Sequence, residues 1–382
     1  MYITQLNELE EFVLRAKTSP FLAIDSEFIR ENTYRPKLCI LQIATSSEIV
    51  IVDYHDKISL EPLKELLTDE SIVKIFHGGS QDIEILFHVT GAVPSPVFDT
   101  QIANALCSST LQASYASLVG IYCKASLDKS CTLSDWERRP LSKEQIKYAQ
   151  EDVRFLPEIY CSINDKLKKL GRETWLKGEI DAVLFKNDED VLPENRYKKL
   201  KKVSILKPKQ LACAKFFAAW RETTAMQRNI PRRWLLPDEQ IVEACKLMPR
   251  NVDQLYSIRG ISKKINLDDA REIVTGITSA LDAPKDTWPL PDVQKQNESS
   301  LEPVLAMLNS LLQLKSKQYN IALRMLATTS ELSDLARGNS QDSRLLKGWR
   351  GEVIGEDIIR LLNGEISLTI KNSNIIIVEN NS

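Results

Sequence analysis

The stretch FLAIDSEFIRENTYRPKLCILQIA, residues 21–44, carries two carboxylates at the end of an apolar run. Short apolar runs bounded by polar residues predict buried strands. Asp25 and Glu27 are two positions apart, so in a strand both side chains project from the same face. Two neighbouring negative charges repel, and we therefore expect a lysine, solvent or a metal ion between them. For an isolated D-x-E, a strand end that reaches solvent or pairs with Arg30 or Arg35 is the simpler interpretation.

Length and composition bound the class of protein. The 382 residues suffice for two or three domains at roughly 100–200 residues each. Net charge is −2, so nucleic-acid binding would have to depend on local basic patches. No apolar run approaches the ~18 residues that span a membrane, and the acidic start MYITQLNELEEFVL does not resemble a signal peptide. Seven scattered cysteines without a CxxC pair disfavour a zinc site or disulfide framework and favour a reducing cytoplasm.

The first half of the chain predicts a single α/β domain over residues 1–190. Four Ile- and Val-rich runs predict strands, at residues 20–25, 38–44, 48–53 and 72–77. The middle two form a hairpin that turns at residues 45–47. SQDIEILFHVTG follows as a helix, with Ser80 as a possible N-cap and Gly91 as its stop.

The second half predicts helical domains only. NRYKKLKKVSILKPK, residues 195–209, holds seven basic residues and no acidic one, which predicts a basic linker over residues 191–207. A helical domain is then expected over residues 208–290. At an offset of 91, residues 229–260 align without gaps over residues 320–351 with seven identical pairs, among them Asn229/Asn320 and Gly260/Gly351. The repeat predicts a second small helical domain of the same type, over residues 295–372.

Three further acidic or aromatic residues join the first two. Asp82 lies in the first turn of a predicted helix, where the helix dipole alone favours an acid. Tyr148 and Asp152 are four positions apart on one helical face, where a packed tyrosine and a surface ion pair would be ordinary. Together, four carboxylates in one small domain would repel unless they bind cations, and their oxygens suit Mg²⁺ or Mn²⁺. Two such ions about 3.5–4 Å apart can hold the attacking and leaving oxygens of a phosphodiester.

The order D-x-E, D, Y-x-x-x-D resembles the DEDD superfamily of 3′-to-5′ exonucleases, which have a ribonuclease H-like fold. Lys147 stands where the alternative histidine of that superfamily would fall, so the sequence is of the tyrosine type. The local wording is similar to the ribonuclease D family over nearly the whole chain. The segments that carry this similarity are DSEFIRENTYRPKLCILQIA, FHGGSQDIEIL, FDTQIANAL, SLDKSCTLSDWERRPLSKEQIKYAQEDVRFL and LLKGWRGEVIGEDIIRLLNG.

The resemblance implies a mixed sheet flanked by helices, followed by two small all-α HRDC-like domains, and it assigns roles to the site residues. Asp25 would bridge two Mg²⁺ or Mn²⁺ ions. Glu27 and Asp152 would complete the site that activates water, and Asp82 would hold the second ion, partly through water. Tyr148 would position the attacking water.

The function that the resemblance implies is a cytoplasmic, monomeric, metal-dependent exoribonuclease. It would remove nucleotides one at a time from RNA 3′ ends, release nucleoside 5′-monophosphates and mature the 3′ ends of tRNA precursors and other structured RNAs. A DNA-directed exonuclease of the same fold and an inactive RNA-binding scaffold are the alternatives, and no membrane partner is expected.

Several basic residues are candidates for contacts to RNA. Lys129 and Arg139 are candidates for phosphate contacts. Arg232, Arg233 and Trp234 are a candidate phosphate-and-stacking patch, although they could equally be a helix start behind Pro231 with the tryptophan in the core. The basic run at residues 195–209 could follow an RNA backbone or be solvated.

Overall fold

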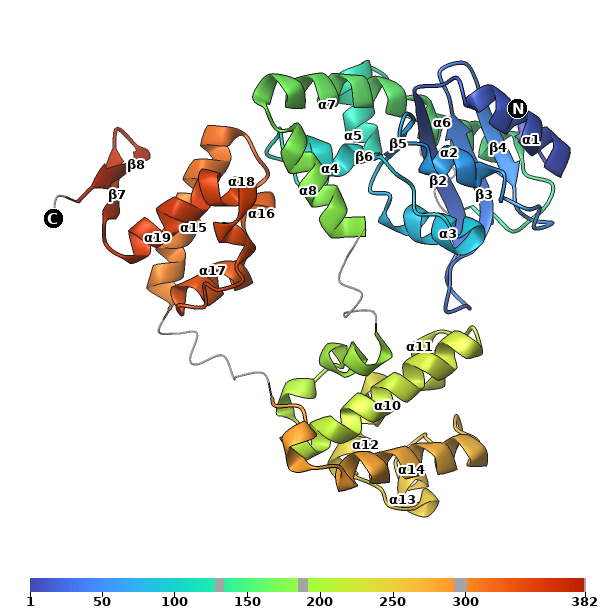
Figure 1. Ribbon diagram of the computed structural model, residues 1–382, viewed down its shortest axis with the longest axis vertical. Helices are drawn as coiled ribbons and strands as arrows, with labels where there is room; N and C mark the ends of the chain where they lie inside the picture. The colour runs from blue at the N-terminus through green and yellow to red at the C-terminus, as the bar shows by residue number, and fades with distance from the viewer. Residues whose placement is uncertain (128–133, 185–191, 292–300, 381–382) are drawn as a thin grey trace. The chain divides into compact units, whose positions relative to one another are not determined.

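The computed structural model describes residues 1–127, 134–184, 192–291 and 301–380. These residues form two compact units (Figure 1). The first unit contains residues 1–27, 38–184 and 301–380, and the second contains residues 28–37 and 192–291. Within the described ranges, no helix has both the length and the apolar character needed to cross a membrane.

A six-stranded mixed sheet forms the centre of the first unit. Its order is β1-β4-β3-β2-β5-β6, with β2, β5 and β6 parallel and β3 antiparallel to β4. The strands are β1 (Tyr2–Ile3), β2 (Phe21–Ile29), β3 (Lys37–Ala44), β4 (Ile49–Asp53), β5 (Val73–Phe76) and β6 (Val97–Asp99). The predicted α/β class and all four predicted strands are confirmed. The two- and three-residue strands β1 and β6 are too short to give a periodic signal in the sequence.

Helices α6 and α7 pack on one face of this sheet. Ala23 and Ile75 of the sheet form one buried cluster with Val153 and Leu156 of these helices. The helices of the nuclease part are α1 (Leu6–Ala16), α2 (Leu63–Thr68), α3 (Ser80–Thr90), α4 (Thr100–Ala105), α5 (Tyr115–Leu118), α6 (Lys143–Arg154), α7 (Leu156–Leu170) and α8 (Glu173–Leu184). Gly91 ends α3 in a left-handed conformation as predicted, but Ser80 is the first helical residue and Gly79 the N-cap.

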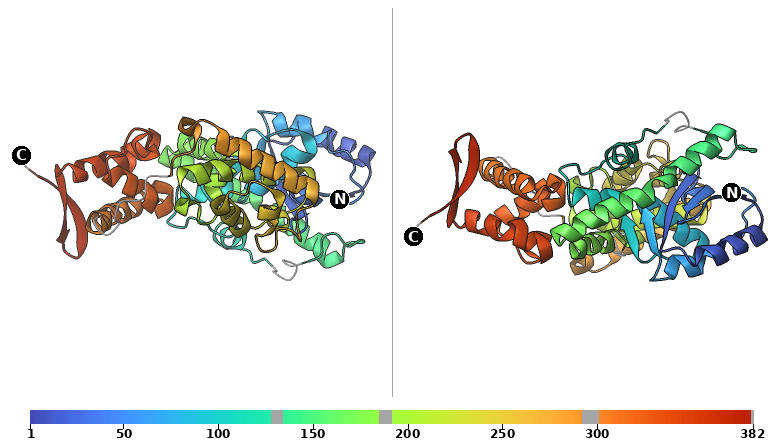
Figure 2. Two further views of the ribbon diagram at one scale, coloured as in Figure 1. Left: turned by 90° about the horizontal axis from the view of Figure 1, so that it is seen from below. Right: turned by 90° about the horizontal axis from the view of Figure 1, so that it is seen from above.

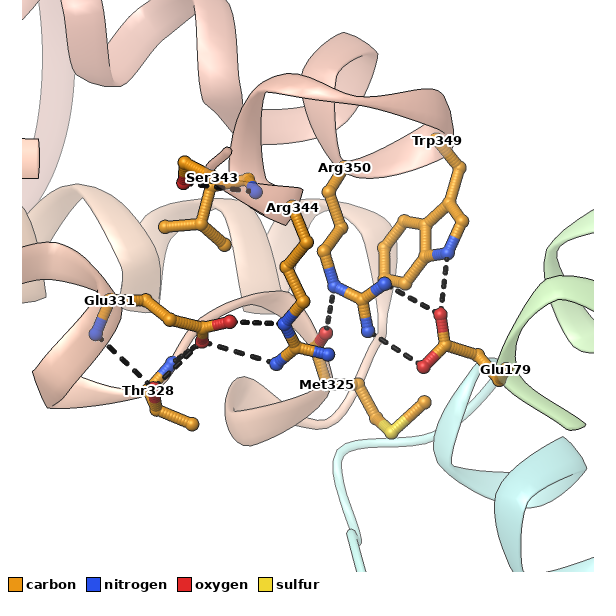
Figure 3. Close-up of polar contacts among 9 residues, drawn as sticks. Glu179, Met325, Thr328, Glu331, Ser343, Arg344, Trp349 and Arg350 are labelled. Atoms are coloured by element: carbon orange, nitrogen blue, oxygen red, sulfur yellow. Dashed lines mark hydrogen bonds and ion pairs between the residues drawn. The ribbon is translucent and has the colours of Figure 1, made fainter. Parts of the chain in front are cut away.

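The C-terminal residues of the first unit share an apolar core with α4, α7 and α8. Their elements are α15 (Glu302–Tyr319), α16 (Leu323–Leu326), α17 (Thr329–Ala336), α18 (Gly348–Arg350), α19 (Glu356–Leu362), β7 (Ile366–Lys371) and β8 (Asn374–Glu379). At the junction, Glu179 of α8 contacts Trp349 and Arg350 (Figure 3). The antiparallel β7–β8 hairpin, drawn in red in Figure 2, departs from the all-α structure expected up to residue 372.

The second unit is helical around its own core. It consists of α10 (Pro208–Gln227), α11 (Arg232–Leu235), α12 (Asp238–Leu247), α13 (Val252–Tyr256) and α14 (Leu267–Asp282), preceded by 3₁₀ turns at Pro193–Lys199 and Val203–Ile205. Leu200 and Leu206 are buried in this core, so the described part of the expected linker is an ordered part of the unit. Residues 28–37, which connect β2 to β3, also belong here: Tyr34 donates a 2.5 Å hydrogen bond to the buried Glu222.

Candidate active site

Three of the predicted site residues converge where β2 meets α6. Asp25 and Glu27 lie on β2 and project from one face, as the alternation predicts. Asp152 comes from the last turn of α6. Each of the three residues offers a carboxylate oxygen, and these oxygens all lie within 4.8 Å of one another. The side chains are partly exposed, so an ion and a substrate phosphate could both reach them.

The carboxylates of this cluster are hard to ionise together. Burial, followed by repulsion from Asp152 and Asp82, raises the pKa of Glu27 to about 8. Burial also raises the pKa of Asp152 to about 7, against the effect of a hydrogen bond from Tyr148. The pKa of Asp25 is raised well above its usual range by burial and by its three acidic neighbours. Such a set is stabilised in its ionised form only when cations bind it.

Asp82 approaches the same cluster from the first turn of α3, but its oxygens are not part of the group of three. Its carboxylate accepts a hydrogen bond from the hydroxyl of Ser26. Burial raises the pKa of Asp82, and this bond opposes the rise. Asp82 is close enough to Asp25 and Glu27 to raise the pKa of both. The four predicted carboxylates therefore lie in one neighbourhood, with Asp82 turned toward Ser26.

The turn before α3 explains how Asp82 is placed. Asp99, at the end of β6, accepts hydrogen bonds from the backbone N–H groups of Gly78 (3.1 Å) and Gly79 (2.9 Å). Gly78 has φ +67°, and a Cβ on Gly79 would lie 2.4 Å from Cβ of Phe76. The two glycines are therefore required by backbone conformation and by space, and are not simply a source of flexibility.

Tyr148 lies one helical turn before Asp152 on α6, as its spacing predicts. Its hydroxyl forms a hydrogen bond with the Asp152 carboxylate. The Trp136 ring, which is 5% exposed, lies with its centroid 6.0 Å from that of Tyr148. The phenol is thus held at the edge of the carboxylate cluster.

Two residues that support the site were not identified from the sequence. Ser26, between Asp25 and Glu27, bonds Asp82, and no sequence pattern signals that contact. Asp99 holds the glycine turn and also caps α4 through the N–H groups of Gln101 and Ile102, at 2.8 and 3.2 Å. An aspartate directly before a helix is a recognised N-cap signal, so the second could have been found.

The basic residues proposed as phosphate contacts are placed differently from expectation. Lys129 lies outside the described residues. Arg139 donates to both oxygens of Asp53, at 2.7 and 2.6 Å, and to backbone carbonyls, so its guanidinium is already engaged. Arg232 pairs with Glu222 at 3.2 Å. Trp234 is 56% exposed, which excludes the core position considered for it.

Comparisons with known proteins agree with this geometry. A family model described as "3'-5' exonuclease" matches residues 1–168, and one described as "HRDC domain" matches residues 210–277. The fold and the site thus define a 3′-5′ exonuclease domain in one chain with an HRDC domain.

Full-length relatives specify the family. The chain is 38% identical to ribonuclease D of Jannaschia sp., covering 99% of both sequences. It is 36% identical to ribonuclease D of Bartonella henselae, covering 98% of this chain and 92% of the relative. It also matches the crystal structure of Escherichia coli RNase D, described as an exoribonuclease involved in structured RNA processing, with TM-score 0.85 and 27% identity over 95% of this chain and 98% of that one. The chain belongs to the ribonuclease D family and is a 3′-5′ exoribonuclease.

Proposed function

We propose that the protein is a metal-dependent exoribonuclease that removes nucleotides one at a time from RNA 3′ ends and releases nucleoside 5′-monophosphates. The observation that carries the metal dependence is the convergence of oxygens from Asp25, Glu27 and Asp152 within 4.8 Å. An all-carboxylate donor set fits Mg²⁺ or Mn²⁺. Because the pKa values of Glu27 and Asp152 are raised to about 8 and about 7, a bound cation would replace protons at neutral pH.

The residues divide the work as follows. Asp25, Glu27 and Asp152 would hold one ion, and Asp25 with Asp82 a second. When bound, the two ions would supply an ionised water and neutralise charge on the phosphate. The Tyr148 hydroxyl, bonded to Asp152, would orient the attacking water along the phosphodiester.

We infer structured RNAs, tRNA precursors among them, as the substrates. The similarity to a ribonuclease described as processing structured RNA supports this class. A second HRDC-like domain within residues 295–372 would add to the grip on such RNA. Helices α11 and α16 begin and end 91 residues apart, as in the sequence repeat. Asn229 and Asn320, also 91 apart, both have φ +48° directly before these short helices.

A time course on a 5′-labelled tRNA precursor with a short 3′ trailer tests the proposal. It would be run with Mg²⁺, Mn²⁺ or chelator, on the wild type, on Asp25→Asn and on Asp56→Asn. Asp56 is exposed, so its variant makes the same change of charge away from the site. The proposal expects a one-nucleotide ladder that needs metal, is lost in Asp25→Asn and persists in Asp56→Asn.

The other outcomes discriminate the alternatives. Faster shortening of a DNA strand of identical sequence would favour a DNA-directed exonuclease. No shortening under any metal, with the RNA still bound, would contradict the proposal and leave an RNA-binding scaffold.

A further inference from the structure

The helical run that carries Asp152 is interrupted at a single residue. Helix α6 ends at Arg154 and α7 begins at Leu156, so Phe155 belongs to neither. In a continuous helix the Phe155 N–H would donate to the carbonyl of Glu151. Here the hydroxyl of Tyr115 lies between these two groups. It donates to the Glu151 carbonyl at 2.8 Å and accepts from the Phe155 N–H at 3.1 Å. A side chain inserted into the hydrogen-bond ladder is a recognised cause of a kink.

A proline contributes to the same break. Pro157 has no N–H to donate to the Val153 carbonyl, and its ring crowds that carbonyl, which opens the helix. The proline accounts for a break at this point but leaves the Glu151 carbonyl and the Phe155 N–H to find other partners. The Tyr115 hydroxyl satisfies both of them at once.

The carbonyl that Tyr115 holds belongs to the peptide group that joins Glu151 to Asp152. Because a peptide group is planar, fixing its carbonyl also fixes the direction of the Asp152 nitrogen and Cα. The Asp152 carboxylate must come within 4.8 Å of the oxygens of Asp25 and Glu27. We propose that Tyr115 is a positioning residue, whose hydroxyl sets the end of α6 so that Asp152 completes the metal site with Asp25 and Glu27. This inference rests on the proposed function of that site.

Tyr115 is well anchored for this role. It is the first residue of α5, where Ser114 is the N-cap and accepts from the Ser117 N–H at 3.2 Å. Its ring packs against the buried cores beneath α6 and α7 and lies 5.7 Å from the ring of His77, centroid to centroid. Burial raises its pKa above the usual range for a tyrosine, so the phenol keeps its proton. A neutral hydroxyl has one proton to donate, and that proton goes to Glu151.

The test compares Tyr115→Phe with Tyr122→Phe in the full-length protein. The Tyr122 hydroxyl donates to the Asn104 side chain at 3.2 Å within the same core, and it makes no printed contact with α6, so its loss controls for removing a hydroxyl. Mn²⁺ affinity would be measured by isothermal titration calorimetry, and kcat and KM on a 5′-labelled RNA with a single-stranded 3′ tail. Loss of a group that orients a metal ligand typically weakens metal affinity by about tenfold or more.

The expected result for Tyr115→Phe is that Mn²⁺ affinity falls at least about tenfold, kcat falls and recovers partly at high Mn²⁺, and KM for RNA is unchanged. Tyr122→Phe should match the wild type in all three. Equal Mn²⁺ affinities for the two variants would overturn the inference and leave Tyr115 a structural residue, whatever their melting temperatures.

Pro157→Ala provides a second test that does not depend on how well Tyr115→Phe folds. With the hydroxyl still inserted, this variant should retain wild-type Mn²⁺ affinity. A loss of Mn²⁺ affinity in Pro157→Ala as large as the one expected for Tyr115→Phe would assign the placement of Asp152 to the proline and overturn the inference. A wild-type protein that binds no Mn²⁺ would instead remove the proposed metal site, and the inference with it.

Discussion

The carboxylate of Glu179 and the guanidinium of Arg350 form a bidentate ion pair, with Nη1–Oε1 at 2.5 Å and Nη2–Oε2 at 2.8 Å (Figure 3). Trp349 donates its indole N–H to the same carboxylate at 3.0 Å, and its ring stacks on that of Trp175 with centroids 4.9 Å apart. Both charged side chains are nearly buried, at 13% and 7% exposed. Paired, bidentate contacts of this kind are among the stronger polar interactions in proteins. They fasten the C-terminal helices to α8 of the nuclease part.

The first prediction is that Glu179→Ala lowers the free energy of unfolding by about 3 kcal/mol or more, because it leaves the Arg350 charge buried without its partner. Urea denaturation measures this loss. The control is Glu65→Ala, which breaks the pair between Lys17 and Glu65, whose side chains are 41% and 68% exposed. An exposed pair of this kind should contribute less than about 1 kcal/mol. Equal losses in the two variants would show that the Glu179 pair does not fasten the C-terminal helices.

The second prediction concerns pH and metal. The pKa values of Glu27 and Asp152 are raised to about 8 and about 7 by burial, whereas the unfolded chain has ordinary values near 4. Between about pH 4 and pH 8 the folded, metal-free protein therefore holds protons that the unfolded chain has released. Its free energy of unfolding should fall as pH rises across this window. Thermal denaturation in chelator at several pH values measures the trend.

Metal should reverse this trend, because a bound cation favours the ionised carboxylates. The gain in melting temperature on adding Mn²⁺ should be small near pH 5 and large near pH 8. Glu27→Gln removes one of the titrating groups and should reduce that gain. A Mn²⁺ effect of the same size at both pH values would contradict the link between proton release and metal binding.

Sequence alone predicted the elements that have a strong local signal. The alternation of Asp25 and Glu27 and the four-residue spacing of Tyr148 and Asp152 fix which side chains share a face, so both pairs were found. The order of motifs then indicated that Asp82 belongs near them. That Asp82 is bonded to Ser26 depends on how α3 packs beside β2, which no local pattern encodes.

Tertiary contacts decided the remaining assignments. Arg139 carries no local sign of its bond to Asp53, which lies 86 positions away. Trp234 is exposed although its size and neighbours also fitted a core position. The C-terminal hairpin lies where the helical repeat was extended by analogy. In each case the outcome depends on distant parts of the chain.

The third prediction follows from the engagement of Arg139. Arg139→Gln should lower the free energy of unfolding by about 3 kcal/mol, since it leaves the nearly buried Asp53 without its bidentate partner. RNA affinity at fixed salt should stay the same, because the guanidinium is not free to bind phosphate. Filter binding and urea denaturation would be measured in parallel. Weaker RNA binding without a loss of stability would return Arg139 to the list of phosphate contacts.

The fourth prediction separates water orientation from metal binding. Tyr148→Phe removes the hydroxyl that bonds Asp152 but none of the carboxylates. We expect kcat to fall on the order of 100-fold while Mn²⁺ affinity remains within about twofold, since Phe is not expected to disturb the ligand oxygens. Tyr160→Phe removes a hydroxyl from α7, where the ring packs edge-on against Phe98, and should leave kcat unchanged. Equal rates for the two variants would exclude a role for the Tyr148 hydroxyl in the reaction.

The fifth prediction concerns the basic run before α10. Lys198, Lys201 and Lys202 are exposed on the 3₁₀ segment, whereas Arg196 is bound to the buried Glu222 at 2.8 Å. If this segment follows an RNA backbone, replacing the three lysines by alanine removes up to three phosphate contacts. The slope of log K against log salt for a single strand should then fall by about 2, at about 0.7 for each contact.

A matched control makes the same change of net charge elsewhere on the surface. Lys168, Lys169 and Lys177 are exposed on α7 and α8, and their replacement by alanine should leave the slope unchanged. Fluorescence anisotropy over a range of salt concentrations, in chelator to prevent degradation, measures both variants. A backbone contact requires the two triple variants to differ. Parallel slopes would instead show that the lysines before α10 are solvated, because a solvated charge releases no counterions when RNA binds.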